Sequence, residues 1–150
     1  MARDRSIVVG TDGSERAERA VVRAGELART LGVKVHVVSG YGIGTDVVLM
    51  SARSRGFPVT DADVAELNRA HAEECVAQAK QRLERLGVES ETHVRLAEPA
   101  DALLRTADEQ DAQMIVIGNR GMAGARRVLG SVPNRVSHHA HCDVLIVDTT

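Results

Sequence analysis

The sequence contains almost no aromatic residues: it has no tryptophan, one tyrosine (Tyr41) and one phenylalanine (Phe57). Proteins that bind single-stranded nucleic acid stack its bases on aromatic side chains in a basic groove. Cages for quaternary ammonium groups are likewise built from aromatic rings. The formal net charge is −2, from 19 Lys and Arg against 21 Asp and Glu. We therefore expect no nucleic acid partner and no aromatic cage.

Long apolar runs are missing as well. No segment approaches the roughly 18 consecutive apolar residues that cross a bilayer, and the charged start Met1–Arg5 lacks the apolar core of a secretion signal. Two cysteines, Cys75 and Cys142, do not make a disulfide framework. We therefore expect a cytoplasmic protein with no membrane partner. Because 150 residues is the size of one domain, residues 1–150 are interpreted as a single domain.

What the sequence does contain is an alternation of short apolar strands and amphipathic helices. We expect strands over residues 7–10, 33–38, 91–96, 114–117 and 144–147, and helices over 15–31, 63–86, 99–107 and 131–140. Residues 41–62 show no clear period and are interpreted as a long, mobile connection beside the ligand site, in the position of a lid. The order β-α-β-α-β-α-β-α-β predicts an α/β fold: a single doubly wound domain whose five-stranded parallel sheet carries helices on both faces.

Two glycine-rich turns follow the first and fourth expected strands. Gly10–Ser14 follows the first, and Gly118–Ser131 follows the fourth. In a doubly wound sheet these two strand ends flank the point where the strand order reverses, so both turns should face one crevice. Glycines let backbone amides approach an anion, and a helix beginning at Ser131 adds its positive end. With the arginines of the second turn, this pattern predicts a polyphosphate site, whereas a pair of glycines alone would indicate only turns.

The pattern departs from the common nucleotide motifs, because neither G-x-x-x-x-G-K-[ST] nor G-x-G-x-x-G after the first strand occurs. The segments that carry a resemblance are Thr11-Asp12-Gly13-Ser14, Gly118-x-x-Gly121 … Gly130-Ser131, and the ending over residues 131–147. Together they resemble the universal stress protein family over essentially the whole chain. The ATP-binding branch of that family carries G-x2-G-x9-G-[ST]. Here eight residues separate Gly121 from Gly130, so the phosphate loop is one residue shorter.

The resemblance implies a Rossmann-like fold of the adenine nucleotide alpha hydrolase type and a homodimeric stress-response regulator that binds ATP. Asp12 would meet the ribose, or a metal such as Mg²⁺ held by the phosphates, and Gly40 would lie beside the adenine. The remaining implied contacts are Gly10, Thr11 and Ile117 at the base and sugar, and Gly118, Gly121, Gly130, Ser131 and Val132 at the phosphates. Arg120 and Arg127 are added on charge alone.

Several alternatives stay open at this point. The shorter loop suits AMP or cyclic AMP as well as ATP, and a metal near Asp12 would suit a slow metal-dependent ATPase. A scaffold without nucleotide, whose glycines only make turns, is a third interpretation. A response-regulator receiver is disfavoured, because it needs a paired acidic cluster after the first strand and a lysine near the last.

The end of the chain holds a further candidate ligand cluster: His138, His139, His141 and Cys142. These are zinc-ligand types, but only His138 and Cys142 share a helical face, and the sequence offers no second ligand group to complete a tetrahedron. We favour histidines at a helix C-terminus, where the helix dipole attracts cations.

The last expected strand, Val144–Val147, is apolar on both faces. Left bare at a sheet edge it would invite aggregation. Pairing with the same strand of a second copy would remove that edge, and the family resemblance implies a homodimer through this element. Helices and the C-terminal tail of one subunit could cover the strand instead.

Overall fold

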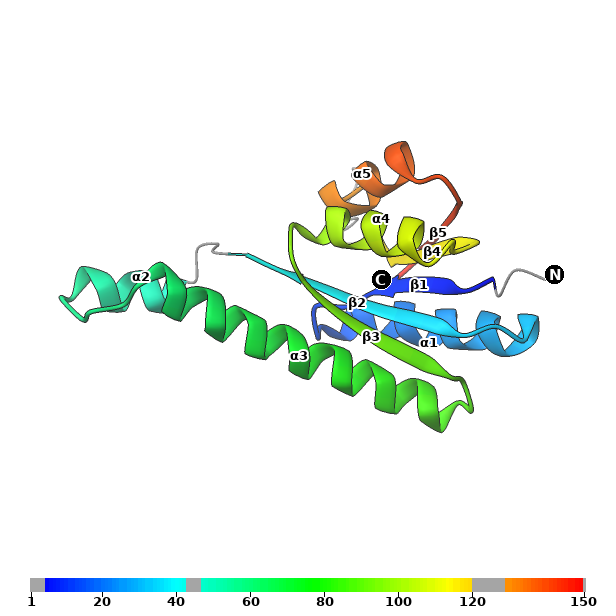
Figure 1. Cartoon of the computed structure of the whole chain (residues 1–150), viewed down its shortest axis with the longest axis horizontal. Helices are drawn as coiled ribbons and strands as arrows, with labels where there is room; N and C mark the ends of the chain where they lie inside the picture. The colour runs from blue at the N-terminus through cyan, green and yellow to red at the C-terminus, as the bar shows by residue number, and fades with distance from the viewer. Residues whose placement is uncertain (1–4, 43–46, 120–128, 150) are drawn as a thin grey trace.

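The computed structural model describes residues 5–42, 47–119 and 129–149, with the backbone only for residues 47–49. One parallel sheet of five strands, in the order β3-β2-β1-β4-β5, forms its centre (Figure 1). The strands are β1 (Ile7–Gly10), β2 (Val35–Tyr41), β3 (Ser90–Leu96), β4 (Met114–Gly118) and β5 (Asp143–Val147). The reversal of order between β1 and β4 confirms the doubly wound α/β fold expected from the sequence.

Helices cover both faces of this sheet. They are α1 (Glu15–Leu31), α3 (Asp61–Arg85), α4 (Pro99–Glu109) and α5 (Ser131–His139), while α2 (Val47–Ser54) lies beyond the strands. Helices α1 and α3 pack on one face, and α4 and α5 pack on the other (Figure 1). Successive side chains of a strand point to opposite faces. Ile7 and Val9 therefore pack against α1 and α3, and Val8 packs against α4 and α5. All three are completely buried, so the central strand β1 reads as a continuous apolar run.

Local sequence signals place the helix ends. Ser14 caps α1, its hydroxyl accepting a hydrogen bond from the amide of Ala17 at 3.2 Å. Gly32 ends the same helix in a left-handed conformation with φ 68°, which glycine adopts without strain. Pro99 opens α4, where its missing N–H costs nothing. Ser14 and Pro99 thus fix the N-termini of α1 and α4, which face the site described below.

The prediction for residues 41–62 is wrong, because part of that stretch is helical. Helix α2 lies within it, and α3 begins at Asp61 through a capping box between Thr60 and Asp63, two residues before the expected start. Arg53 holds this region together: its guanidinium donates to the carbonyl of Val59 and pairs with Asp61, both at 3.0 Å. Helix α2 is shorter than the stretch over which a helical period can be recognised, so the sequence pattern did not reveal it.

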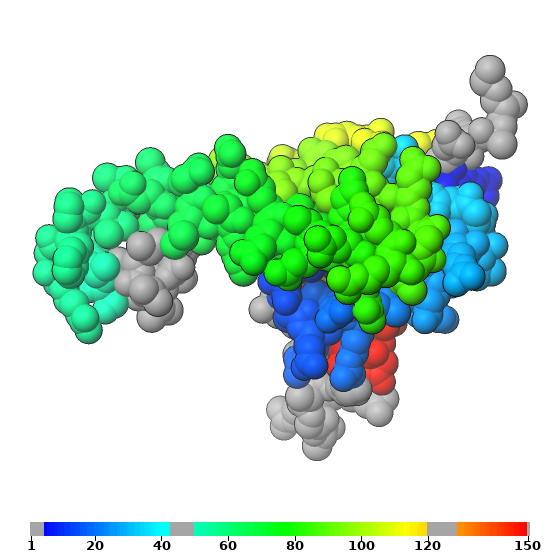
Figure 2. All heavy atoms as spheres, turned by 90° about the horizontal axis from the view of Figure 1, so that it is seen from below, coloured from blue at the N-terminus to red at the C-terminus, as the bar shows by residue number. Residues whose placement is uncertain are grey.

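Helix α3 is longer than the sheet that it covers. Its N-terminal half and α2 extend together beyond the strands (Figures 1 and 2). Several large apolar side chains of this region are uncovered: Leu67 of α3 is 50% exposed, Met50 of α2 53%, and Phe57 between the two helices 62%. The helical period of α3 is thus correct, but its first two turns do not contribute to the sheet core. Within the described segments, no helix is long and apolar enough to cross a membrane.

Candidate functional site

A pocket opens at the carboxyl ends of β1, β2 and β4, where the strand order reverses. This is the position at which open α/β sheets bind ligands. Its walls come from six segments: Gly10, Thr11 and Asp12 after β1; Ser14, Arg16 and Ala17 of α1; Val38, Ser39 and Gly40 of β2; Pro99 and Leu103 of α4; Ile117 and Gly118 of β4; and Val132 and Pro133 of α5. Sequence analysis expected the two glycine-rich turns to meet here; of the second turn, Gly118 lines the pocket and residues 120–128 lie outside the described part of the chain.

The floor of the pocket is aliphatic. Val38, Leu103 and Ile117 are all buried, and none of the described lining residues is aromatic. A flat heterocycle would therefore lie against aliphatic side chains and backbone edges, not between rings. Such a wall gives contact area and shape but few directed interactions, so polar selectivity must come from the rim.

Charge at the rim comes from both signs. Asp12 is exposed, and Arg16 is the only cation among the described residues that line the pocket. Arg16 lies in the first turn of α1, so this cation lines the pocket near the positive end of the helix dipole. This combination favours an anion such as a phosphate at the rim.

The turn after β1 is held by its own side chains. The carboxylate of Asp12 accepts a hydrogen bond from the amide of Ser14 at 3.0 Å, and the hydroxyl of Thr11 accepts one from Gly13 at 3.2 Å. Gly13 has φ 80°, and a methyl group on it would lie 2.8 Å from the sulfur of Cys75. The turn is therefore pre-formed, and Asp12 takes part in the helix start as well as facing the pocket.

Two glycines of the wall permit close packing. A methyl group on Gly40 would lie 2.6 Å from the carbonyl oxygen of Ala97 and 3.2 Å from the backbone of Pro99. On Gly10 it would meet only the side chain of Leu103, at 3.2 Å. The end of β2 thus touches the backbone leading into α4, and only glycine allows this approach.

The segment after β4 is tied to the C-terminal residues. Asn119 is buried, and its side-chain oxygen accepts hydrogen bonds from the amide and hydroxyl of Thr149 at 3.0 and 2.7 Å. Its amide group donates to Asp148 at 3.1 Å. Asn119 therefore fixes the point at which the glycine-rich segment leaves the sheet. Sequence analysis missed this role, for which the only signal is a polar residue directly after an apolar strand.

The predicted site residues fall into three groups. Seven of them line the one pocket: Gly10, Thr11, Asp12, Gly40, Ile117, Gly118 and Val132. Gly130 and Ser131 lie at the start of α5 beside Val132, outside the lining itself. Arg120, Gly121 and Arg127 lie outside the described residues.

Arg16, which no sequence motif singled out, lines the pocket. Its position depends on how the start of α1 meets the sheet, which a periodic pattern does not specify. No described residue of the segment 42–62 belongs to the lining, and a lid from this segment that closes over a bound ligand stays a prediction.

Comparison with known proteins supports the resemblance found in the motifs. The family model described as "Universal stress protein family" matches residues 5–148. The chain belongs to this family. A universal stress protein of Mycobacterium tuberculosis is 37% identical over 152 residues, with 100% of both chains covered.

Solved structures of universal stress proteins share the fold. One, a universal stress protein in complex with cAMP, is 32% identical with a TM-score of 0.71, over 97% of this chain and 98% of the other. Another, from Archaeoglobus fulgidus in complex with dAMP, is 32% identical with a TM-score of 0.69, over 95% of this chain and 96% of the other. The Rossmann-like fold is therefore shown, and the family includes proteins that bind adenine nucleotides.

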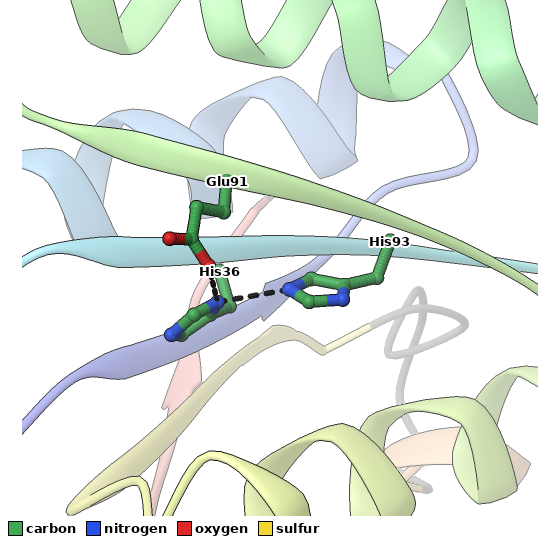
Figure 3. Close-up of side chains that lie close together, drawn as sticks. All are labelled: His36, Glu91 and His93. Carbon is green, nitrogen blue, oxygen red and sulfur yellow. Dashed lines mark hydrogen bonds and ion pairs between the residues drawn. The ribbon is translucent and has the colours of Figure 1, made fainter.

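The histidines near the C-terminus do not gather. His138 and His139 are exposed at the end of α5, while His141 lies 3.3 Å from a carboxylate oxygen of Asp108. Burial raises the pKa of the Cys142 thiol, so the thiolate that binds metals is disfavoured. A different group, which sequence analysis missed, does come together elsewhere: His36, Glu91 and His93 (Figure 3).

Proposed function

We propose that this protein binds an adenine nucleotide in the pocket at the ends of β1, β2 and β4. The observation that carries the proposal is the convergence of seven predicted contact residues on that one pocket. Two relatives at 32% identity have been solved in complex with cAMP and with dAMP. This supports an adenine ring with a nearby phosphate as the part of the ligand that the pocket recognises. The absence of aromatic lining fits a base held by aliphatic contacts and main-chain hydrogen bonds.

In this proposal the base and sugar lie over Val38, Leu103 and Ile117, and the phosphates lie toward the N-termini of α1 and α5. Asp12 contacts the ribose or a phosphate-bound Mg²⁺. Gly118, Gly130, Ser131 and Val132 offer backbone amides, and Arg16 supplies a positive charge at the rim. Arg120, Gly121 and Arg127 complete the phosphate contacts in the segment outside the described residues.

ATP is the ligand proposed first, from the resemblance to the ATP-binding branch. A second candidate is a mononucleotide, AMP or cyclic AMP. The loop that is one residue shorter suits it as well as ATP, and the ligands of the two related complexes favour it. Because each additional phosphate needs amide or cationic partners, the number of partners along residues 118–131 decides between these ligands.

We further propose a cytoplasmic stress-response regulator that acts as a homodimer through Val144–Val147. Strand β5 is an edge of the sheet, and its residues from 144 to 147 are only partly buried. An apolar edge strand in this state is suited to pairing with a second copy. Sedimentation equilibrium at micromolar concentration tests this, and a monomer there would contradict it.

Nucleotide binding is tested by isothermal titration calorimetry with ATP, AMP and cyclic AMP, each with and without Mg²⁺. Arg16→Gln should weaken the binding of ATP more than the binding of cyclic AMP, because ATP carries more negative charge. Arg29→Gln is the matched control: it makes the same change in charge at the other end of α1, outside the pocket. Absence of binding by all three nucleotides would refute the proposal.

A binding role without rapid turnover is proposed, in preference to a slow metal-dependent ATPase. Phosphate release in the presence of Mg²⁺ separates the two. Sustained release that disappears in Asp12→Ala would favour the ATPase. Release no faster than that of a protein-free control, together with tight binding, would favour the regulator.

A further inference from the structure

Three metal-ligand side chains meet on the sheet face that α4 covers, outside the nucleotide pocket (Figure 3). His36 on β2 stands opposite Glu91 on β3 in the parallel register. His93 follows two residues later on β3 and therefore points to the same face. The Nδ1 atom of His36 lies 2.9 Å from Nε2 of His93 and 3.4 Å from a carboxylate oxygen of Glu91.

These spacings suit one metal ion. Ligand atoms about 2.0–2.1 Å from a tetrahedral zinc ion are roughly 3.3 Å apart. All three candidate ligand atoms lie within 4.8 Å of one another, so small adjustments of the side chains would bring them onto one ion. Both strands are held by seven register pairs along the sheet, which fixes the backbone positions of the three residues before any ion arrives.

Hydrogen bonding within the protein leaves His36 incompletely satisfied. The side chain of His36 is completely buried. Its Nε2 atom, which points away from Glu91 and His93 in Figure 3, has no hydrogen-bond partner among the described residues. A buried polar atom without a partner opposes folding. An ion held by Nδ1 would leave Nε2 in this state, so the case for an ion rests on the three ligand atoms that face one another.

The protonation states are those that bind metals. Burial, together with neighbouring positive charges, lowers the pKa values of His36 and His93, so both rings are neutral at neutral pH. A hydrogen bond from Lys34 lowers the pKa of Glu91. Lys34 occupies one oxygen of that carboxylate at 3.1 Å and leaves the other facing His36.

The surrounding charges balance. Lys34 and Arg95 would repel a cation, but Arg95 is paired with Glu109 and donates to Thr106 at 2.9 Å. With Glu91 and Glu109 opposing them, the four charges sum to zero, so the site is neither acidic nor strongly basic. Glu91 is half-exposed on the edge strand β3, so an ion could reach the three ligand atoms from solvent on that side.

We propose that His36, Glu91 and His93 form a binding site for a divalent transition metal of the zinc class. Two imidazoles and a carboxylate with an open position are a zinc-type ligand set. None of the three residues lines the nucleotide pocket, so the metal site does not depend on the proposed nucleotide.

The test uses the full chain after removal of metal with a chelator. Zn²⁺ is titrated by calorimetry, and Co²⁺ is added as a spectroscopic probe, because a tetrahedral cobalt site absorbs visible light. We expect one Zn²⁺ per chain and a higher unfolding temperature with Zn²⁺. His93→Gln and Glu91→Gln should each lower the affinity for Zn²⁺ more than about tenfold. Loss of even a residue that only orients a metal ligand lowers metal affinity about 10- to 100-fold.

The matched control is a triple variant in which glutamine replaces each of the three exposed histidines, His138, His139 and His141. It should leave the affinity for Zn²⁺ unchanged. Loss of binding in this control, with retention in His93→Gln, would show adventitious binding at the C-terminal histidines and overturn the proposal. No binding by the unaltered chain would overturn it as well. His93 and Glu91 are chosen as the tested positions because they are less buried than His36, whose replacement threatens the fold.

Discussion

Gly40→Ala tests whether the end of β2 must touch the turn before α4. The added methyl group would lie 2.6 Å from the carbonyl oxygen of Ala97, whereas a carbon and an oxygen normally approach to about 3.3 Å. The turn cannot simply retreat, because the amide of Ala97 donates to the carbonyl of Tyr41 at 3.0 Å. Strand and turn must therefore move apart by about 0.7 Å, or the hydrogen bond must break.

The size of the effect follows from two opposing terms. Overpacking of this kind costs about 1–3 kcal/mol, and the reduced freedom of alanine in the unfolded chain returns about 0.4–1 kcal/mol. A net loss of ~1–2 kcal/mol in a 150-residue domain corresponds to a fall in unfolding temperature of roughly 2–8 °C. Adenine nucleotide should also bind more weakly, because Gly40 and Pro99 both line the pocket.

Circular dichroism is the suitable assay, because a chain without tryptophan has little intrinsic fluorescence to follow. Gly10→Ala is the matched control: its methyl group meets only the rotatable side chain of Leu103, so its unfolding temperature should fall less. An unfolding temperature of Gly40→Ala within about 1 °C of the unaltered protein, together with unchanged nucleotide affinity, would refute this account of the close approach.

Three further predictions concern pH, the C-terminal clamp and a helix cap. His36 and His93 have pKa values lowered mainly by burial, so below about pH 6.5 the unfolded chain binds more protons and stability falls as pH drops. Urea unfolding at several pH values should show this fall, and a reduced fall in His93→Gln; equal slopes would contradict it. Asn119→Ala should cost about 1–3 kcal/mol in urea unfolding by leaving the buried amide of Thr149 without its partner, and a neutral effect would contradict the clamp. Thr60→Ala should cost ~1 kcal/mol through loss of the α3 cap while nucleotide affinity, measured by calorimetry, stays unchanged; weaker binding would mean that α3 influences the pocket.

The sequence by itself determined the strands, most of the helices and the place of the pocket. Ile7–Gly10 is apolar on both faces, which only a central parallel strand tolerates, and Gly32 and Pro99 mark helix ends through fixed backbone preferences. The two glycine-rich turns then had to converge, because carboxyl ends of parallel strands lie at one edge of the sheet. These inferences need only local conformation and the rule of right-handed crossovers.

Tertiary structure alone decided the features that depend on which segments become neighbours. Helix α2 is too short for a helical period to stand out, and its Arg53 meets Val59 and Asp61 only in the folded chain. Arg16 reaches the pocket because of how α1 meets β1, and Asn119 acquires its role only when Thr149 returns beside it. The group of His36, Glu91 and His93 exists only in the observed register of β2 and β3; a shift of one residue would turn its members to opposite faces.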